Sequence, residues 1–210
     1  MPQIKGTKRA SSTQTPQRLV AATTELLSMV GFSGTTVRAI GERAGCNAAL
    51  VSYHFGSLNA LLLAALDASS DARRARYDTE LAEVGNWREA RRVLRRLYQE
   101  DRDCGHVDLL AEMVAGGLMD RDLGRQVAFR IEPWVILIED LIVRLVPTAA
   151  LRRRLPVREL AYGITASFLG LGLLGTLTQD HSRGDAVVQR LTAERSTWRL
   201  LTAPQKPADR

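Results

Sequence analysis

The sequence predicts an all-α protein with an N-terminal three-helix helix-turn-helix head and a larger helical body, about nine helices in all. Three observations lead to this fold class. Apolar residues recur at helical spacing along most of the chain. Glycines, prolines and capping side chains interrupt that pattern at intervals typical of helix ends. No alternating apolar and polar run bounded by turn residues predicts a strand.

The expected elements of the head follow from local capping signals. A hydroxyl before a proline is typical of a helix start, and glycine is typical of a helix end. The predicted elements are a flexible basic arm at 1–14, a helix from Thr15–Pro16 to Gly31, a second capped by Thr35 or Thr36 and ended by Gly45, and a third from Asn47 to Gly56.

The body is expected to be helical from Ser57 onward. The predicted helices lie at about 57–82, 87–103, 106–119, 121–146, 157–179 and 184–201, separated by glycine, asparagine and proline. We therefore divide the chain into an arm at 1–14, a head at 15–60, a body at 61–203 and a disordered tail at 204–210.

Composition is ordinary for a globular protein, but the charge is unevenly distributed. The 210 residues are 45% hydrophobic and 25% charged, which suffices for a substantial core. Residues 1–60 hold six Lys or Arg against two Glu, a net +4 out of the total of +6. This imbalance favours a polyanionic partner at the N-terminus, although net charge alone is a weak argument.

The two cysteines and the polar N-terminus indicate a cytoplasmic protein. Cys46 and Cys104 are too few for a disulfide framework. A secretory signal needs an apolar core, whereas residues 10–17 read ASSTQTPQ.

The stretch from Leu160 to Gln179 is uncharged and about long enough to span a bilayer. Its glycines, threonines and serine favour a buried packing helix over the alternative of a membrane span. Gly163, Ser167 and Gly170 lie on one helical stripe that allows another helix to approach closely.

The second and third helices have the spacing of a helix-turn-helix, whose second helix enters the major groove of DNA. Asn47, Ala48 and Ala49 are short enough to approach base edges, and an alanine methyl can contact thymine. Ser52, Tyr53 and His54 are suited to phosphate contacts that fix the register.

The start of the second helix is expected to take part as well. Thr35 and Thr36, with the amides at that helix end, favour a phosphate, and Arg38 is placed to reach a guanine or a phosphate. Leu50, Val51 and Phe55 are expected to turn back into the core.

The segment TTVRAIGERAGCNAALVSYHFGS resembles the N-terminal DNA-binding domain of TetR-type bacterial transcriptional regulators. The resemblance covers about residues 15–65, and the rest of the chain has only the right length and helical character. It departs from the family at Leu58, where a lysine that contacts phosphate is usual. A lost contact would weaken binding to all DNA sequences, and Lys5, Lys8 and Arg9 are candidates to compensate.

The resemblance implies a homodimeric repressor that binds a palindromic operator and is released by a small molecule in its C-terminal domain. It also implies a four-helix dimer interface from the helices at 157–179 and 184–201, and we place Gly163, Ser167, Gly170 and Leu174 there. Two alternatives stay open: a regulator without a small-molecule effector, and a ligand-sequestering dimer with weakened DNA binding.

Sparse aromatics in a mostly apolar body favour a hydrophobic effector. Met113, Phe129, Trp134 and Phe168 are candidates to line its pocket, with plain core packing as the alternative for each.

Two further motifs each have a functional interpretation and a purely structural one. DCGHVD at 103–108 offers metal-ligand or Cys–His chemistry, but without a second cluster we expect a polar helix junction. The arginine runs at 88–96 and 152–154 offer extra DNA contacts, but we expect solvated or paired helix faces. No nucleophile–base pair, phosphate loop or dinucleotide fingerprint is present, so we predict no enzyme, no cofactor and no metal.

Overall fold

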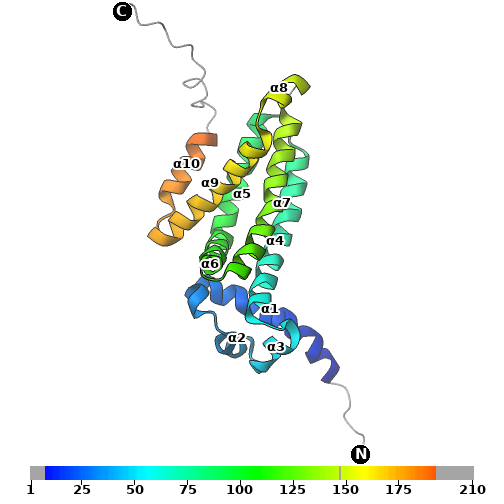
Figure 1. Ribbon diagram of the computed structural model, residues 1–210, viewed down its shortest axis with the longest axis vertical. Coiled ribbons are helices and arrows are strands. Elements are labelled where there is room, and N and C mark those ends of the chain that lie inside the picture. Colours follow the sequence, from blue (N-terminus) through cyan, green and yellow to red (C-terminus); the bar gives the residue numbers. More distant parts are fainter. Residues whose placement is uncertain (1–7, 147, 193–210) are drawn as a thin grey trace, which may run out of the picture.

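The computed structural model describes residues 8–146 and 148–192, and within them every regular element is a helix. This confirms the all-α prediction. The head comprises α1 (Lys8–Gly34), α2 (Val37–Ala44) and α3 (Ala49–Phe55). The body comprises α4 (Leu58–Ala82), α5 (Trp87–Asp103), α6 (His106–Met119), α7 (Arg121–Leu145), α8 (Ala149–Arg154), α9 (Val157–Thr178) and α10 (Ser182–Thr192). The head lies at one end of an elongated molecule, and α4 runs from it into the body (Figure 1).

Most predicted boundaries in the body agree with the structure, and two differ. The six-residue α8 was not predicted, because its apolar content is too small to produce a periodic signal. The last predicted helix, 184–201, begins at Ser182 and is described only as far as Thr192. Its remainder and the predicted tail at 204–210 lie outside the described residues.

The predicted start of the first helix was wrong. α1 begins at Lys8, so Pro16 lies inside it and residues 8–14 of the predicted flexible arm are helical. Proline removes one helical hydrogen bond and disfavours helix before it, but this preference does not forbid a preceding turn. Gly31 does interrupt the helix as predicted, with φ 73° and ψ −177°, and the chain continues helically to Gly34.

The head packs around a single apolar cluster. Its buried members come from all three head helices and from the start of α4, namely Leu19, Ala22, Ile40, Ala44, Val51 and Leu61. Helices α2 and α3 cross closely because Gly41 has no side chain: a Cβ there would lie 3.0 Å from the Ala48 Cα. This contact fixes the orientation of α3 against α2.

Helix α4 joins the head to the body through its apolar residues. Leu61 belongs to the head cluster, whereas Leu62, Leu63 and Leu66 belong to a body cluster with Leu109 and Met113, which Leu27 of α1 also joins. Leu58 is partly buried against both clusters. The nearly uncharged start of α4 therefore packs against both the head and the body.

Helix α9 packs on α6, α7 and α10, and one of its faces stays exposed. By length and composition alone, α9 would suffice to cross a membrane, and α3 with α4 would as a pair bent by 68°. Leu61, Leu62, Leu63 and Leu66 of α4 are buried inside the protein. Leu160, Tyr162, Ile164, Leu174 and Leu177 of α9 are exposed large hydrophobics.

Candidate nucleic-acid interface

Local capping holds α2 and the turn that follows it. The Thr36 hydroxyl accepts a hydrogen bond from the Ala39 amide at 3.2 Å, as predicted for an N-cap. Gly45 ends α2 in the left-handed conformation, with φ 62°. The Arg18 guanidinium of α1 donates to the Ala44 carbonyl, so α1 also fixes the end of α2.

Helix α3 presents one apolar and one polar face. Val51 is fully buried, and Leu50 and Phe55 pack against the same head cluster, as predicted. Ser52 and Tyr53 lie on the outside, and Tyr53 is 80% exposed. An aromatic hydroxyl this exposed is available to a partner.

The start of α3 differs slightly from the prediction. The helix begins at Ala49 rather than directly after Asn47, and its N-cap, Ala48, has no capping side chain. The Asn47 carboxamide instead accepts from the Ala49 amide at 2.9 Å across a turn. Ala49 is exposed and Ala48 is half-buried at the contact with Gly41.

Tyr53 and His54 form an edge-to-face pair, with ring centroids 4.8 Å apart. Gly56 follows with φ 77°, and the Ser57 hydroxyl accepts from the Ala60 amide to cap α4. The two polar rings are thus held at a sharp turn between two capped helices.

Thr35 does not reach the proposed interface. It is 2% exposed, and its hydroxyl donates to the Gly31 carbonyl at 2.7 Å. The adjacent Thr36 is exposed, as is Arg38, whose guanidinium bonds Glu42 at 2.9 Å. The contact with Gly31 turns Thr35 inward and leaves Thr36 outside, and the sequence did not decide between them. The DNA contacts of Thr36, Arg38 and the α3 residues stay a prediction.

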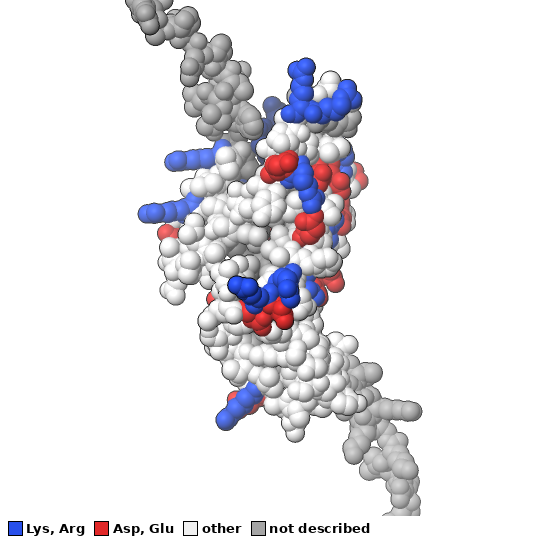
Figure 2. Space-filling model, in the orientation of Figure 1, with Lys and Arg blue, Asp and Glu red and all other residues white. Residues whose placement is uncertain are grey.

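The arginines in the described part of the head already have partners within the protein. Arg38 pairs with Glu42 and Arg43 with Glu25, while Arg18 donates to backbone carbonyls. The face of the head in Figure 2 is mostly uncharged, with a single basic projection. Lys5 lies outside the described residues, as do the side chains of Lys8 and Arg9. Within the described residues, the candidate interface thus presents polar side chains rather than a basic patch.

A junction between α1 and α6, which the sequence did not predict, holds the head on the body. The Phe32 amide donates to the Glu112 carboxylate at 2.7 Å. The Phe32 ring occupies the space where a Cβ on Gly116 would lie. Nearby, the Asn59 carboxamide donates to Asp120 at 2.7 Å.

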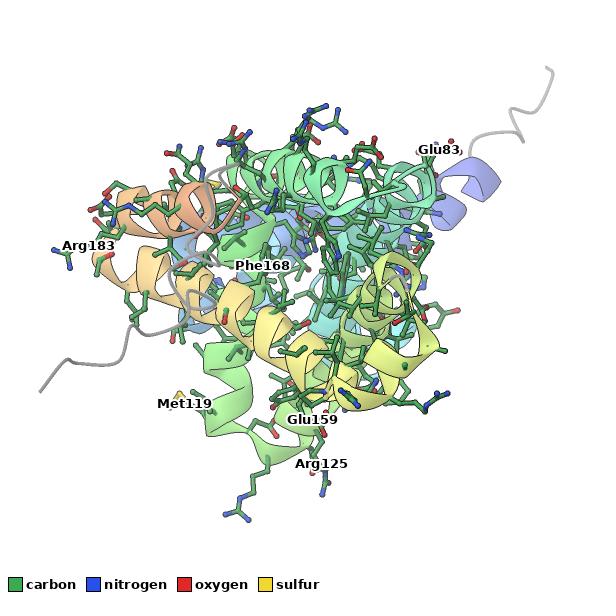
Figure 3. All side chains as sticks on the ribbon, turned by 90° about the horizontal axis from the view of Figure 1, so that it is seen from above. Glu83, Met119, Arg125, Glu159, Phe168 and Arg183 are labelled. Atoms are coloured by element: carbon green, nitrogen blue, oxygen red, sulfur yellow. The ribbon has the colours of Figure 1, made fainter. Side chains whose placement is uncertain are left out.

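The four predicted pocket residues are not brought together. Met113 is fully buried in the body cluster, Trp134 packs edge-on against Tyr77, and Phe168 packs edge-on against Tyr98. Phe129 is 77% exposed and borders neither the small cavity beside Trp134 nor the hollow between α5 and α10, so the structure does not favour its place in a pocket. Figure 3 shows Phe168 on the inner side of α9, and Met119 and Arg125 at the projecting corner between α6 and α7.

Trp134 does border a small cavity of about 10 Å³, which is about the minimum for one water. The cavity is lined by Leu66, Ser70, His106, Leu110, Arg130, Ile131 and Trp134.

Beside this cavity lies a buried polar cluster that the sequence analysis missed. The fully buried Asp101 carboxylate accepts from Arg73 at 2.5 Å, from the Tyr77 hydroxyl at 2.6 Å and from Arg76 at 2.9 Å. Arg73 also lies over the Trp134 ring, 4.6 Å from its centroid. The only indication of this cluster in the sequence was that Arg73 and Tyr77 lie one helical turn apart, on the same helix face as the buried leucines.

His106 borders the same cluster and is held neutral. Its Nδ1 lies 2.5 Å from the Ser69 hydroxyl. Burial and the nearby Arg73 charge lower the pKa of His106 to about 3, against a smaller opposing effect of Asp101. Burial and the Asp101 charge raise the pKa of Tyr77.

The DCGHVD motif does not assemble a metal site within the described residues. Cys104 is exposed, and its thiol donates to the Asp101 carbonyl. Asp108 accepts from the Thr176 hydroxyl at 2.7 Å and lies 3.5 Å from His181. These contacts are those of a polar helix junction.

The predicted interface stripe on α9 faces away from the body. A Cβ on Gly163 or Gly170 would have no neighbour within 4 Å, Ser167 is exposed, and Leu174 is 60% exposed. The four residues are thus placed on one open helix face.

Comparison with known proteins agrees with this geometry. Residues 19–65 match the family described as bacterial regulatory proteins, tetR family. No curated protein matches the chain significantly.

Solved structures of similar fold cover most of the chain. A TetR-family transcriptional regulator from a Rhodococcus species is 23% identical, with a TM-score of 0.67 over 84% of this chain and 95% of that one. The fatty acid degradation regulator FadR from Bacillus halodurans is 13% identical, with a TM-score of 0.68 over 84% and 96%. The multidrug binding protein EbrR is 22% identical, with a TM-score of 0.56 over 87% and 97%.

Proposed function

We propose that this chain, a TetR-type transcriptional regulator, is a homodimeric repressor that binds a palindromic operator and is released by a small molecule in its body. The observation that carries the proposal is the exposed polar face of α3, supported from behind by Val51 and the head cluster. A short helix with small residues at its start and polar side chains beyond fits the major groove.

The described contacts support specific roles. Asn47 and Ala49 lie at the exposed start of α3, where they would meet base edges. Ser52, Tyr53 and His54 would meet phosphates, together with Thr36 at the start of α2. Arg38 would exchange Glu42 for a phosphate at little cost, because a fully exposed ion pair contributes little to stability.

The open face of α9 supports dimerisation. Leu160, Tyr162, Leu174 and Leu177 are exposed on α9, and Leu191 is 63% exposed on α10. Covering these side chains with the same helices of a second copy would bury apolar surface that a monomer leaves in water. A two-fold dimer would place two α3 helices about one DNA turn apart, which suits an inverted repeat.

Helix α6 supports a coupling between effector and DNA. Its first turns supply His106 and Leu110 to the small cavity, and its last turns supply Glu112 and Gly116 to the contact with Phe32. The cavity is too small for an effector, so binding requires α6 or α7 to move. A ligand that prefers the moved state shifts the head, typically with a coupling free energy of about 1–3 kcal/mol.

The apolar lining around Trp134 supports a hydrophobic effector with a polar group that faces His106 or Arg130. EbrR, which is named as a multidrug binding protein, has the same fold. The protein would act in the cytoplasm, without a membrane, cofactor or metal.

Two alternatives remain distinct from this proposal. A regulator without a small-molecule effector would keep operator binding and show no ligand release. A ligand-sequestering dimer would bind DNA weakly, and its one hint is Leu58, which packs between head and body instead of facing a phosphate.

The first test is selection of bound sequences from random duplex DNA at two salt concentrations. We expect an enriched inverted repeat and a steep loss of affinity with salt. Tyr53→Ala with His54→Ala should abolish enrichment, whereas the control Thr79→Ala on the exposed side of α4 should not. An enriched half-site without symmetry would contradict the dimer, and no enrichment would contradict DNA recognition.

The effector is tested afterwards on the selected operator. Apolar compounds with one polar group are screened for release of labelled operator DNA, with Trp134→Ala as the matched variant. Release of operator DNA from the wild type but not from Trp134→Ala supports the cavity beside Trp134 as the effector site. Absence of release with every compound class favours the regulator without an effector.

A further inference from the structure

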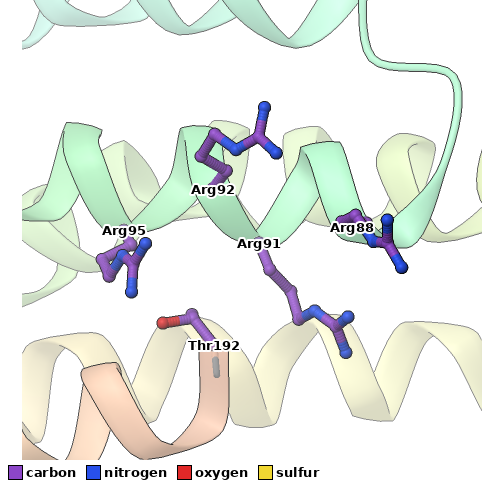
Figure 4. Close-up of a pocket in the computed structure, with 5 residues that line it drawn as sticks. All are labelled: Arg88, Arg91, Arg92, Arg95 and Thr192. Carbon is purple, nitrogen blue, oxygen red and sulfur yellow. The ribbon is translucent and has the colours of Figure 1, made fainter. Parts of the chain in front are cut away.

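We infer that the hollow between α5 and the end of α10 binds a small anion that carries two or more phosphate groups. Four arginines of α5 line the hollow together with one threonine of α10: Arg88, Arg91, Arg92, Arg95 and Thr192 (Figure 4). Its volume is about 40 Å³, larger than the 10 Å³ cavity beside Trp134 and larger than one water requires.

The spacing of the arginines concentrates positive charge on one part of α5. Residues three and four apart on a helix are neighbours, so Arg95 and the two arginines one turn before it, Arg91 and Arg92, repel each other when nothing lies between them. Arg91 and Arg95 extend toward α10 on either side of Thr192 (Figure 4). A multiply charged anion at this place would replace that repulsion with attraction.

Arg91 and Arg95 differ in their partners from other arginines of α5. Arg96, the next residue on α5, pairs with Glu80 and Glu100, and Arg102 pairs with Asp103 and Asp185. Arg91 and Arg95 form no ion pair within the described residues, whereas the charge of Arg92 acts on Glu89 and helps to lower the pKa of that carboxyl.

Arg91 adds a second sign of an absent partner. Its Nε is buried and has no hydrogen-bond partner within the described residues. A buried donor without a partner is costly, about 1–3 kcal/mol. Glu89 is the closest acidic residue along the chain, and its carboxylate accepts from the Gly85 amide instead. The structure thus leaves donors that an external acceptor would satisfy.

Arginine chemistry selects the class of anion. Each guanidinium is a planar fork that matches two oxygens of a phosphate, and it stays charged at any physiological pH. The Thr192 hydroxyl already donates to the Val188 carbonyl at 2.6 Å, so the arginines supply the donors. Figure 4 shows the Arg91 and Arg95 side chains on the side of α5 that faces α10, whereas Arg92 points away. Two guanidinium forks along one hollow suit linked phosphates better than a single carboxylate.

The hollow is too far from the head to contact the same DNA. Helix α4 has 25 residues and separates α3 from the start of α5 (Figure 1). At 1.5 Å per residue, it spans roughly 37 Å. A duplex bound by α3 would therefore not reach Arg91, so the expected ligand is small and free in solution.

One internal competitor is visible in the sequence. Among residues 193–210, which lie outside the described part, the acids are Glu194 and Asp209. Glu194 follows Thr192 by two residues, so a carboxylate of the chain itself is the alternative occupant. The test therefore includes Glu194→Gln.

Titration calorimetry of the full chain with sodium pyrophosphate, ATP and sodium sulfate at constant ionic strength tests the site. Pyrophosphate should bind the wild type more tightly than sulfate. The double variant Arg91→Gln/Arg95→Gln should weaken binding at least about tenfold, because two charge-assisted contacts are lost. The control Arg96→Gln, on the same helix but already paired, should change it less than about twofold.

The outcomes separate cleanly. ATP binding equal to pyrophosphate assigns the site to a phosphate chain, and tighter ATP binding assigns it to a nucleotide. Equal losses in Arg96→Gln and the double variant would show nonspecific charge attraction and overturn the site. Binding to Glu194→Gln but not to the wild type would show that the chain fills its own hollow, which overturns the proposal. Absence of binding to both the wild type and Glu194→Gln would overturn it as well. Circular dichroism confirms that the variants fold.

Discussion

The head and the body handle polar side chains in opposite ways. In the head, Tyr53, Ser52 and Asn47 are exposed; the Asn47 carboxamide accepts from the Ala49 amide, and the Tyr53 ring packs against His54. In the body, Asp101 is fully buried and is held by two arginines and a tyrosine. The head therefore leaves these polar groups accessible from outside, as the proposed DNA contact requires, whereas the body uses its buried set to fix its own packing.

The largest expected effect is therefore in the body. Asp101→Asn leaves Arg73 buried without its counter-charge, and we expect the free energy of unfolding to fall by about 3–5 kcal/mol. Asp78→Asn breaks the exposed pair with Arg74 and should cost about 0–1 kcal/mol. Urea denaturation of both variants measures the difference. Equal losses would contradict the distinction between buried and exposed pairs.

The junction between the two regions should come next. Gly116→Ala pushes on the Phe32 ring and should cost up to about 3 kcal/mol. Adding Phe32→Ala removes the obstacle, so the double variant should be no less stable than Phe32→Ala alone. A Gly116→Ala variant as stable as wild type would show that the ring moves freely and that the junction is loose.

A pH effect from His106 should be of similar or smaller size. Its folded pKa of about 3 lies below the unfolded value near 6.5, so the unfolded chain binds the extra proton as pH falls. The stability is present in full above about pH 6.5 and is lost progressively toward pH 3. Between pH 7 and 5 this amounts to about 2 kcal/mol. Denaturation midpoints of wild type and His106→Gln check it: the variant should lack this part of the slope, and identical slopes would contradict a buried neutral histidine.

The smallest effect on stability is expected in the head. Tyr53→Ala removes a side chain that is 80% exposed, so unfolding should change by less than about 0.5 kcal/mol. Affinity for the selected operator should nevertheless fall about tenfold or more, because a phosphate contact is lost at each half-site of a dimer. Parallel denaturation and fluorescence-anisotropy titrations measure both quantities. A large loss of stability without a loss of binding would show that Tyr53 serves the fold rather than DNA binding, contrary to the contrast between head and body.

The same contrast explains what the sequence could predict. Gly45 and Ser57 were assigned correctly, and Thr36 was one of two candidates for its cap, because a cap depends on residues within one turn of the chain. Val51 was assigned correctly because a short helix with one apolar face has one orientation. Family resemblance supplied the DNA-binding role, which helical spacing alone does not contain.

The body was less predictable because its decisive contacts are long-range. Asp101 meets Arg73 from a different helix, 28 residues away in sequence. Phe129 has the spacing of a core residue, yet α7 turns it outward while Val127 and Ile131 pack inside. Apolar spacing identifies a helix face without saying whether another helix covers it.

Leu58 sets a limit on how freely the two regions can be exchanged. Because it packs against the apolar clusters of both the head and the body, neither cluster is complete without it. A chimera that joins this head to another regulator's body would need to carry the first two turns of α4 with it. The boundary between the two exchangeable parts therefore lies inside helix α4, not in the loop before it.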